Sequence, residues 1–180
     1  MTNKASNVKV SLEQILASRE QRANRQQAWL FQSEQTVVSV TLVWPGERKD
    51  TELARQVMAV ANETLGALFR AHHWTVSRHQ ALQPVTGPEA LWSVAAPAWM
   101  IKHVTAHLED THALGRLWDI DVLCPKAGLV KRDAIQQPMR RCFICDEPAH
   151  ACSRARRHSP AELARVIEEM TSDYFACQAV

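Results

Sequence analysis

Hydrophobic positions recur along this chain with two different periods, and the two periods predict two kinds of element. Between positions 50 and 70, Leu53, Val57 and Leu65 recur at helical spacing and indicate an amphipathic helix. Positions 36–44 (TVVSVTLVW) are instead rich in β-branched residues and indicate a largely buried strand, which a Pro-Gly turn ends. The chain is therefore expected to mix helices with strands.

Helix-capping residues support several of the expected boundaries. Ser11 and Gln14 have the spacing of a capping box, and so do Ser159 and Glu162, while Asp50 is expected to cap the second helix. Helices are expected over 11–31, 50–70, 98–110 and 159–176, and strands over 36–44, 74–85, 91–96 and 117–123.

The order of elements from position 36 to 124 is β-α-β-β-α-β. This order is typical of the α+β class and of the ferredoxin-like, palm-type fold, in which an antiparallel sheet carries two helices on one face. With no repeat and only five glycines, the chain shows no linker, so a single domain over 1–180 is expected. Its parts are an N-terminal helix (1–35), the α/β core (36–124) and a Cys/Arg-rich loop with a final helix (125–180).

Composition narrows the class of protein. With 46% hydrophobic and 22% charged residues in 180, the chain has the composition of a soluble globular domain. No apolar run reaches the roughly 18 residues of a membrane span, and the first ten residues lack the apolar stretch of a secretory signal. A cytoplasmic protein with no membrane partner is expected. Five cysteines, three of them within positions 142–152, favour reduced thiols or a metal site over disulfides.

The strand expected over 117–123 carries two aspartates separated by one residue. Side chains alternate between the faces of a strand, so Asp119 and Asp121 should project from the same face, opposite to Ile120 and Val122. Two adjacent carboxylates repel each other unless a cation lies between them, and Mg²⁺ prefers oxygen ligands and bridges to phosphates. The pair predicts a magnesium site for phosphate chemistry; the alternative is the polar face of an amphipathic strand.

Residues near this strand are further candidates. Glu109 is a candidate third carboxylate ligand and His112 a candidate base for an attacking hydroxyl, unless they are a solvated helix residue and a turn residue. Gly115 permits close approach of a ligand, and Arg116 offers a guanidinium to phosphate. The first helix also has a basic edge, which either binds phosphate or is an ordinary solvated face. That edge consists of Arg19, Arg22 and Arg25.

A group of cysteines with a histidine follows in the C-terminal region. The spacing Cys142-x2-Cys145-x6-Cys152-x5-His158 supplies four ligands suited to a closed, structural Zn²⁺ site. His150 is an alternative fourth ligand, and three unrelated thiols are the alternative to any metal.

The same region is basic. Positions 131–158 contain seven Lys/Arg and three acids, a local excess of +4 (7 − 3) that includes Arg140 and Arg141. Such an excess indicates a phosphate-rich ligand or an acidic partner surface, or else a solvated basic tail.

These residues resemble those of a known family. The run Glu109-x-x-His112-x-Leu114-Gly115-Arg116-Leu117-Trp118-Asp119-Ile120-Asp121-Val122 is similar to the signature of the citrate lyase holo-acyl-carrier-protein synthases, also called apo-citrate lyase phosphoribosyl-dephospho-CoA transferases. Further similar stretches are Ser18-Arg19-x-x-Arg22-x-x-Arg25-Gln26, Gly87-Pro88-Glu89, Ala95-Ala96-Pro97, and Arg140-Arg141-Cys142-x-x-Cys145 with Cys152 and His158. The resemblance extends from about Val10 to Tyr174.

The resemblance implies a nucleotidyltransferase reaction. Such enzymes attach 2′-(5″-triphosphoribosyl)-3′-dephospho-CoA to a serine of the apo acyl carrier protein, the γ subunit of citrate lyase, forming a phosphodiester and releasing pyrophosphate. It further implies that Asp119 and Asp121 hold Mg²⁺ against the triphosphate and that His112 or Glu109 deprotonates or orients the serine. Donor phosphates would be bound by Arg116, with Arg19, Arg22 and Arg25. The basic region 131–158 would dock the acidic carrier protein or grip the dephospho-CoA moiety.

Three alternatives stay open. A polymerase-β-like fold has a Gly-Ser pair upstream of its Asp-x-Asp, whereas this sequence contains no Gly-Ser pair, which favours the ferredoxin-like arrangement. The same chemistry on a malonate decarboxylase carrier is a second possibility. The third is a zinc-stabilised adaptor for nucleic acid or protein; the 6% aromatic content and the lack of an RNA-binding motif speak against nucleic acid as a partner.

Overall fold

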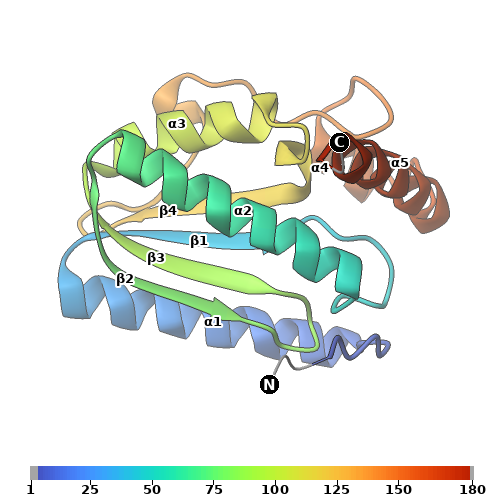
Figure 1. Ribbon diagram of the computed structural model, residues 1–180, viewed down its shortest axis with the longest axis horizontal. Coiled ribbons are helices and arrows are strands. Elements are labelled where there is room, and N and C mark those ends of the chain that lie inside the picture. The colour runs from blue at the N-terminus through green and yellow to red at the C-terminus, as the bar shows by residue number, and fades with distance from the viewer. Residues whose placement is uncertain (1–3, 179–180) are drawn as a thin grey trace.

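Strands from the middle of the chain form one antiparallel sheet (Figure 1). The structure is a computed structural model that describes residues 4–178. The sheet has the order β2-β3-β1-β4-β5, and every pair of neighbours is antiparallel. The strands are β1 (Thr36–Leu42), β2 (Thr75–Leu82), β3 (Glu89–Ala95), β4 (Trp118–Cys124) and β5 (Gly128–Val130).

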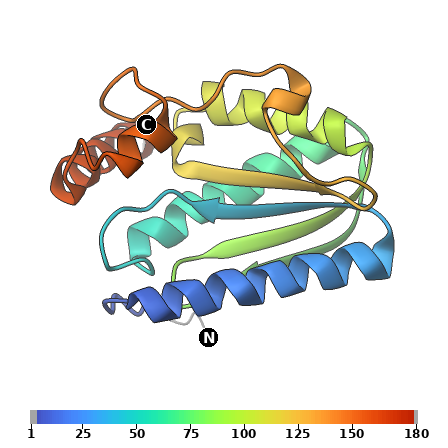
Figure 2. The same ribbon diagram turned by 180° about the vertical axis from the view of Figure 1, so that it is seen from behind.

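Helices cover both faces of this sheet. They are α1 (Leu12–Ser33), α2 (Glu52–Ala71), α3 (Ala98–Thr111), α4 (Ala149–Arg154) and α5 (Pro160–Gln178), with 3₁₀ turns η1 (Gly115–Leu117) and η2 (Asp133–Ile135). Helices α2 and α3 lie on one face and α1 lies along the other, while α5 packs at one end of the sheet (Figures 1 and 2). The mixed α/β architecture and the β-α-β-β-α-β order over 36–124 are confirmed. No described helix combines the length and apolarity that crossing a membrane requires.

The alternation of side chains along the strands separates two apolar clusters. Val38 and Val40 point to the α2/α3 face, where they pack with Trp118 and Phe69 in the main core. Val37 points to the opposite face and packs under the C-terminal half of α1 in a smaller cluster. Full burial of side chains of this size stabilises the fold by about 1.5–3 kcal/mol each. The α1 face is apolar at one end only, which leaves room for polar groups at the other.

Both predicted capping boxes are present at the helix starts, whereas the single cap predicted for α2 is not. The Ser11 hydroxyl accepts from the Gln14 N–H, and the Gln14 side chain accepts from the Ser11 N–H. At α5, Ser159 and Glu162 bond reciprocally in the same way.

The prediction that Asp50 caps α2 is wrong. Thr51 is the N-cap, and its hydroxyl accepts from the Ala54 N–H at 3.1 Å. Asp50 is buried, and its carboxylate instead accepts from the Arg55 side chain and from the Ser6 N–H. The Arg55 guanidinium, five residues further along the chain, holds the Asp50 carboxylate in charge-assisted hydrogen bonds, and Thr51 takes the cap position.

The region after β4 contains elements that the periodicity did not predict. Strand β5 pairs with β4 only from Val122 to Cys124, so the first half of β4 has no strand on its outer side. The 3₁₀ turn η2 and the six-residue α4 follow, and each is too short to show a hydrophobic period.

Candidate functional site and metal cluster

Both aspartates of β4 project from the same face of the sheet, as predicted, and this is the face that α1 covers. Along β4 the burial alternates, with Trp118, Ile120 and Val122 in the core and Asp119 and Asp121 partly accessible. In the register with β1, Asp121 lies opposite Ser39 and Asp119 opposite Thr41. The pair therefore occupies the polar end of the α1 face.

The surroundings of Asp121 make its negative charge unfavourable in the absence of a cation. Burial, followed by the negative charge of Asp119, raises the pKa of Asp121 to about 6, although the Lys102 ammonium opposes the shift. Hard oxygen ligands held side by side fit Mg²⁺, whose charge would reverse this repulsion. The donor set thus fits the predicted metal.

Helix α1 brings two of its three candidate arginines to this face. Arg22 Nε donates to Glu89 Oε2 at 2.7 Å, and Arg25 donates to the other oxygen of the same carboxylate. Glu89 is only 1% exposed. Burial lowers the pKa of Arg22, while the charges of Asp121 and Asp119 act in the opposite direction. The Arg22 guanidinium is therefore bonded to Glu89 and also interacts with the negative charge of the Asp pair.

The third arginine of that edge is placed differently. Arg19 is exposed, and its positive charge contributes to lowering the pKa of Lys49, after the larger effect of burial. It lies outside the group formed by Arg22, Arg25 and Glu89. Sequence analysis included Glu89 only as part of a family-like stretch, and its partners are 64 and 67 residues away.

Glu109, the candidate third carboxylate ligand, has hydrogen-bond partners that support the strand edge. Its Oε1 accepts from the Ile120 N–H at 2.8 Å, and its Oε2 accepts from Arg132 Nη2 at 2.6 Å. Lys102 Nζ donates to the Ile120 carbonyl at 2.8 Å. These α3 side chains complete the outer edge of β4 where β5 does not reach, because buried backbone groups need partners. Both carboxylate oxygens of Glu109 therefore already accept hydrogen bonds.

His112 lies beside the core face of β4. Its ring centroid is 4.4 Å from that of Trp118 and 5.5 Å from that of Tyr174, and its Nδ1 accepts from the Leu114 N–H at 3.0 Å. Burial lowers the pKa of His112, so the ring is neutral near pH 7. Since Trp118 and Asp119 point to opposite faces, the structure does not bring His112 together with the Asp pair.

Gly115 is required for packing. A Cβ at this position would lie 2.4 Å from the Leu108 carbonyl oxygen and 2.8 Å from that of Glu109. The close approach that the glycine permits is therefore to the end of α3, and this approach explains the residue without a ligand.

Arg116 and Arg140 join the C-terminal region to the start of β4 by a reciprocal exchange. Arg116 Nη2 donates to the carbonyls of Arg141 at 2.7 Å and Cys142 at 2.5 Å. In return, Arg140 Nη2 donates to the Arg116 carbonyl at 2.8 Å, and Arg140 Nη1 lies 3.3 Å from Asp119 Oδ1. The predicted phosphate ligand Arg116 is thus also a tether, and Arg140 reaches the Asp pair.

The three cysteines and the histidine of the predicted cluster lie close together in the structure. One ligand atom from each of Cys142, Cys145, Cys152 and His158 lies within 4.8 Å of all the others. His158 Nε2 is 3.3 Å from Cys145 Sγ, whereas His150 is exposed and outside the group. All five cysteines are free thiols. Three thiols and an imidazole at this separation can hold a metal such as zinc.

Comparison with known proteins defines the class of enzyme to which this chain belongs. The chain is a transferase, and thus an enzyme. A family described as "Apo-citrate lyase phosphoribosyl-dephospho-CoA transferase" matches residues 10–174, and the chain belongs to this family.

Individual relatives agree with the family match. A protein of that name from Escherichia coli O1:K1 / APEC is 39% identical over 173 residues, which cover 96% of this chain and 94% of that protein. Proteins of the same name from Escherichia coli O7:K1 (strain IAI39 / ExPEC) and Shigella flexneri serotype 5b (strain 8401) show the same identity and coverage.

Proposed function

We propose that this enzyme transfers a phosphoribosyl-dephospho-CoA group from 2′-(5″-triphosphoribosyl)-3′-dephospho-CoA to a serine of the apo citrate lyase acyl carrier protein, the γ subunit. The serine oxygen forms a bond to the α-phosphorus, the bond between the α-phosphorus and its bridging oxygen breaks, and pyrophosphate leaves. The proton of the serine hydroxyl passes to solvent water. Membership of a family named for transfer to apo-citrate lyase supports the substrates.

One observation carries the chemistry: two aspartates and two arginines share the α1 face of the sheet. The carboxylates of Asp119 and Asp121 would hold Mg²⁺, which supplies neutralisation of charge on the phosphates during displacement. Arg22 and Arg25 would bind the outgoing phosphates, held in place by the buried Glu89 carboxylate. Because Arg140 reaches Asp119, it is positioned to bind the donor once a cation neutralises that carboxylate.

The geometry favours neither Glu109 nor His112 as the general base. Glu109 positions β4 through its bond to the Ile120 N–H, and we assign it no proton transfer. His112 is neutral and therefore able to accept a proton, but it lies on the other side of β4 from the Asp pair. The variant His112→Asn directly tests whether His112 is the general base.

We also propose that strands β1 to β4 with α2 and α3 form a ferredoxin-like unit. Its support is the order β2-β3-β1-β4 with antiparallel pairing throughout, and the placement of both helices on one face. Strand β5 and helices α1 and α5 would be additions to this unit.

The Cys142, Cys145, Cys152 and His158 cluster is proposed to hold a structural Zn²⁺. Four protein ligands close the coordination shell, and sites of this type stabilise folded structure without taking part in catalysis. Elemental analysis of the purified protein tests this directly: one zinc per chain is expected, and its loss from a Cys145→Ser variant identifies the site.

Mass spectrometry of apo carrier proteins tests the reaction. The protein, the triphosphoribosyl donor and Mg²⁺ are incubated with the carrier of citrate lyase or with that of malonate decarboxylase. A phosphoribosyl-dephospho-CoA adduct on a serine of the citrate lyase carrier, with pyrophosphate released in equal amount, is expected. An adduct on the malonate decarboxylase carrier alone would transfer the proposal to that substrate, and no adduct on either would refute it.

A further inference from the structure

A cavity of about 540 Å³ lies where the C-terminal region meets the end of the sheet. Its volume is typical of small-molecule sites. Four arginines contribute to its lining, and Val43, Phe143 and Leu163 add an apolar wall. Those arginines are Arg116, Arg140, Arg141 and Arg156. A ligand for this cavity needs both anionic groups and apolar or aromatic surface.

We propose that this cavity binds the dephospho-CoA part of the donor, while the triphosphate end lies at Asp119 and Asp121. The inference rests on the proposed function and adds a location to it. Dephospho-CoA has the required chemistry, because its pyrophosphate is anionic and its adenine and pantetheine arm offer aromatic and apolar surface.

Arg140 links the cavity to the Asp pair. Arg140 lines the cavity, and its Nη1 lies 3.3 Å from Asp119 Oδ1. One side chain therefore touches both places, so a single extended donor can span them.

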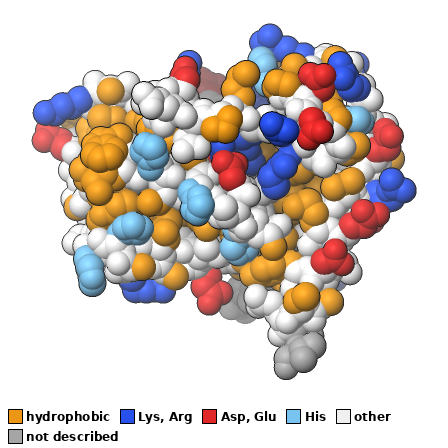
Figure 3. Space-filling model, turned by 90° about the horizontal axis from the view of Figure 1, so that it is seen from above, with side chains coloured by type: hydrophobic (Ala, Val, Ile, Leu, Met, Phe, Trp, Pro, Cys, Tyr) orange, Lys and Arg blue, Asp and Glu red, His pale blue; other side chains and the backbone are white. Residues whose placement is uncertain are grey.

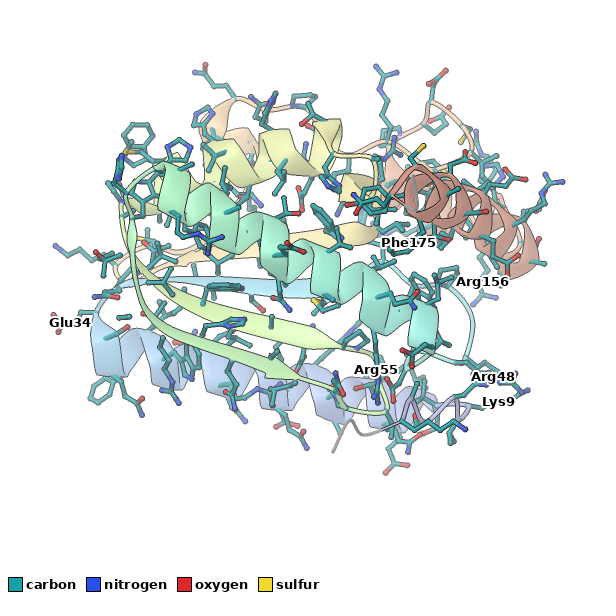
Figure 4. All side chains as sticks on the ribbon, in the orientation of Figure 1. Lys9, Glu34, Arg48, Arg55, Arg156 and Phe175 are labelled. Atoms are coloured by element: carbon teal, nitrogen blue, oxygen red, sulfur yellow. The ribbon has the colours of Figure 1, made fainter. Side chains whose placement is uncertain are left out.

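Arg156 is the cavity arginine whose guanidinium is least engaged in hydrogen bonds and ion pairs with the protein. Arg116 and Arg140 donate to backbone carbonyls, and Arg141 has an ion pair at 3.4 Å with the exposed Asp146. Within residues 4–178, no acidic side chain forms an ion pair with Arg156. Figure 4 shows Arg156 below α5, on the side of the loop that follows β1. An unpaired guanidinium on a cavity wall is suited to a phosphate.

The charge of the C-terminal region favours a small anion over a carrier protein at this place. Arg132 is bound to Glu109 and Asp110, and Arg157 pairs with Glu147 at 3.5 Å. On the face seen in Figure 3, basic and acidic side chains are intermixed. The local excess of positive charge is thus largely neutralised at the surface, and an acidic protein would meet no continuous basic patch on that face.

The metal cluster forms part of the cavity wall. Cys142, Cys152 and His158 are ligands of the cluster and also line the cavity. Occupation of the cluster by zinc would therefore hold the wall in place, and loss of the metal would remove the binding site as well as local order.

Binding of dephospho-CoA, measured by calorimetry, tests the proposal without turnover. Arg156→Gln is compared with Arg154→Gln, a matched control because Arg154 belongs to α4, is exposed and does not line the cavity. Arg156→Gln should raise the Kd for dephospho-CoA and the KM for the donor about tenfold, as expected for one charged hydrogen bond. Arg154→Gln should change both by less than about twofold. Chelation of the zinc should abolish binding of dephospho-CoA while circular dichroism retains the sheet and helices.

The outcomes separate this inference from the proposed function. If the wild-type protein modifies the carrier but Arg156→Gln and Arg154→Gln have the same donor KM, the cavity is not the donor site. If Arg156→Gln raises the KM for the carrier instead, the cavity belongs to the carrier interface and the inference is overturned. If the wild-type protein modifies no carrier yet binds dephospho-CoA through Arg156, the proposed reaction fails and the site stands.

Discussion

The sheet core and the C-terminal region of this enzyme are stabilised by different means. Leu65, Phe69 and Trp118 are fully buried in a core built from strands and two helices. After Cys124, the buried hydrophobic residues among those described are Ile135, Cys142, Cys152 and Ile167, and two of these four are thiols of the metal cluster. The second region has little apolar area to bury, so its order would depend on a metal held by the Cys/His cluster and on the arginine tethers.

The two regions also hold different parts of the proposed active site. Core strands hold Asp119, Asp121 and Glu89 on a rigid sheet, so the proposed magnesium site would be prearranged. The C-terminal region holds the cavity arginines on short elements, which depend on the cluster and on the Arg116 and Arg140 bonds. Local opening of the second region would leave the first intact, and the variants below test this separation from the largest expected effect to the smallest.

Asp119→Asn should abolish transfer without unfolding the core. Removing one of two metal-binding carboxylates should lower kcat by about a thousandfold, equivalent to about 4 kcal/mol of lost transition-state stabilisation. The free energy of unfolding should stay within about 1 kcal/mol, because the Asp119 side chain is 50% exposed. Transfer assays and urea denaturation measure the two quantities. Asp173→Asn, an exposed change on α5, is the control; undiminished activity of Asp119→Asn would refute the metal site.

Cys145→Ser should disorder the C-terminal region while the sheet persists. Loss of one ligand should release zinc, and amides of α4 should exchange at least about a hundredfold faster, because little else holds this helix. Amides of β1 should keep their protection. Hydrogen exchange measures both regions in one experiment, with the exposed thiol variant Cys177→Ser as control. Simultaneous loss of protection in β1 and α4 would show that the two regions fold as one unit.

The metal-free protein should lose stability as pH rises through the titration of Asp121. Its folded pKa is about 6 and its ordinary value is 3.8, so the folded state binds the proton more tightly. Stability is therefore greatest below pH 3.8 as far as this group is concerned, and falls between pH 3.8 and about 6 by about 2–3 kcal/mol at most.

Urea denaturation at pH 5 and pH 7 measures the part of this fall that lies above pH 5, which is about 1 kcal/mol. Asp121→Asn should remove that part of the pH dependence, and Mg²⁺ should restore stability to the wild-type protein at pH 7 but not to the variant. Equal pH dependence in wild type and Asp121→Asn would contradict the burial of this charge.

His112→Asn should have the smallest effect. An Asn side chain retains an acceptor for the Leu114 N–H, and the ring lies on the opposite side of β4 from the Asp pair. We expect kcat to fall less than about tenfold, with an unchanged pH profile, since a positioned base contributes about a hundredfold or more. A fall above a hundredfold with a shifted pH profile would restore His112 as the base.

Local patterns in the sequence predicted most of the fold and the central pair of the site. Strand alternation placed Asp119 and Asp121 on one face, and capping spacing located the starts of α1 and α5, because these rules depend only on neighbours in the chain. Cysteine spacing likewise predicted the cluster.

Partners distant in the chain were beyond such rules. The bond between Arg22 and Glu89 spans 67 residues, and the bond from Ile120 to Glu109 depends on how α3 packs beside β4. For the same reason the sequence could not show that Arg116 would serve as a tether. A signal for Glu89 was nevertheless present, since an acidic residue at the start of a buried strand needs a buried cation.

The sequence by itself determined strands β1 to β4, helices α1, α2, α3 and α5, the shared face of Asp119 and Asp121, and the three cysteines of the cluster, since each follows from a period or a spacing of a few residues. Only the structure decided that His158, and not His150, joins these cysteines. Tertiary structure alone decided which arginines reach the aspartates, that Glu109 supports a strand edge, and that the cluster lines a cavity next to Asp119. These contacts arise when distant segments pack, and packing is set by the shape and burial of the whole chain.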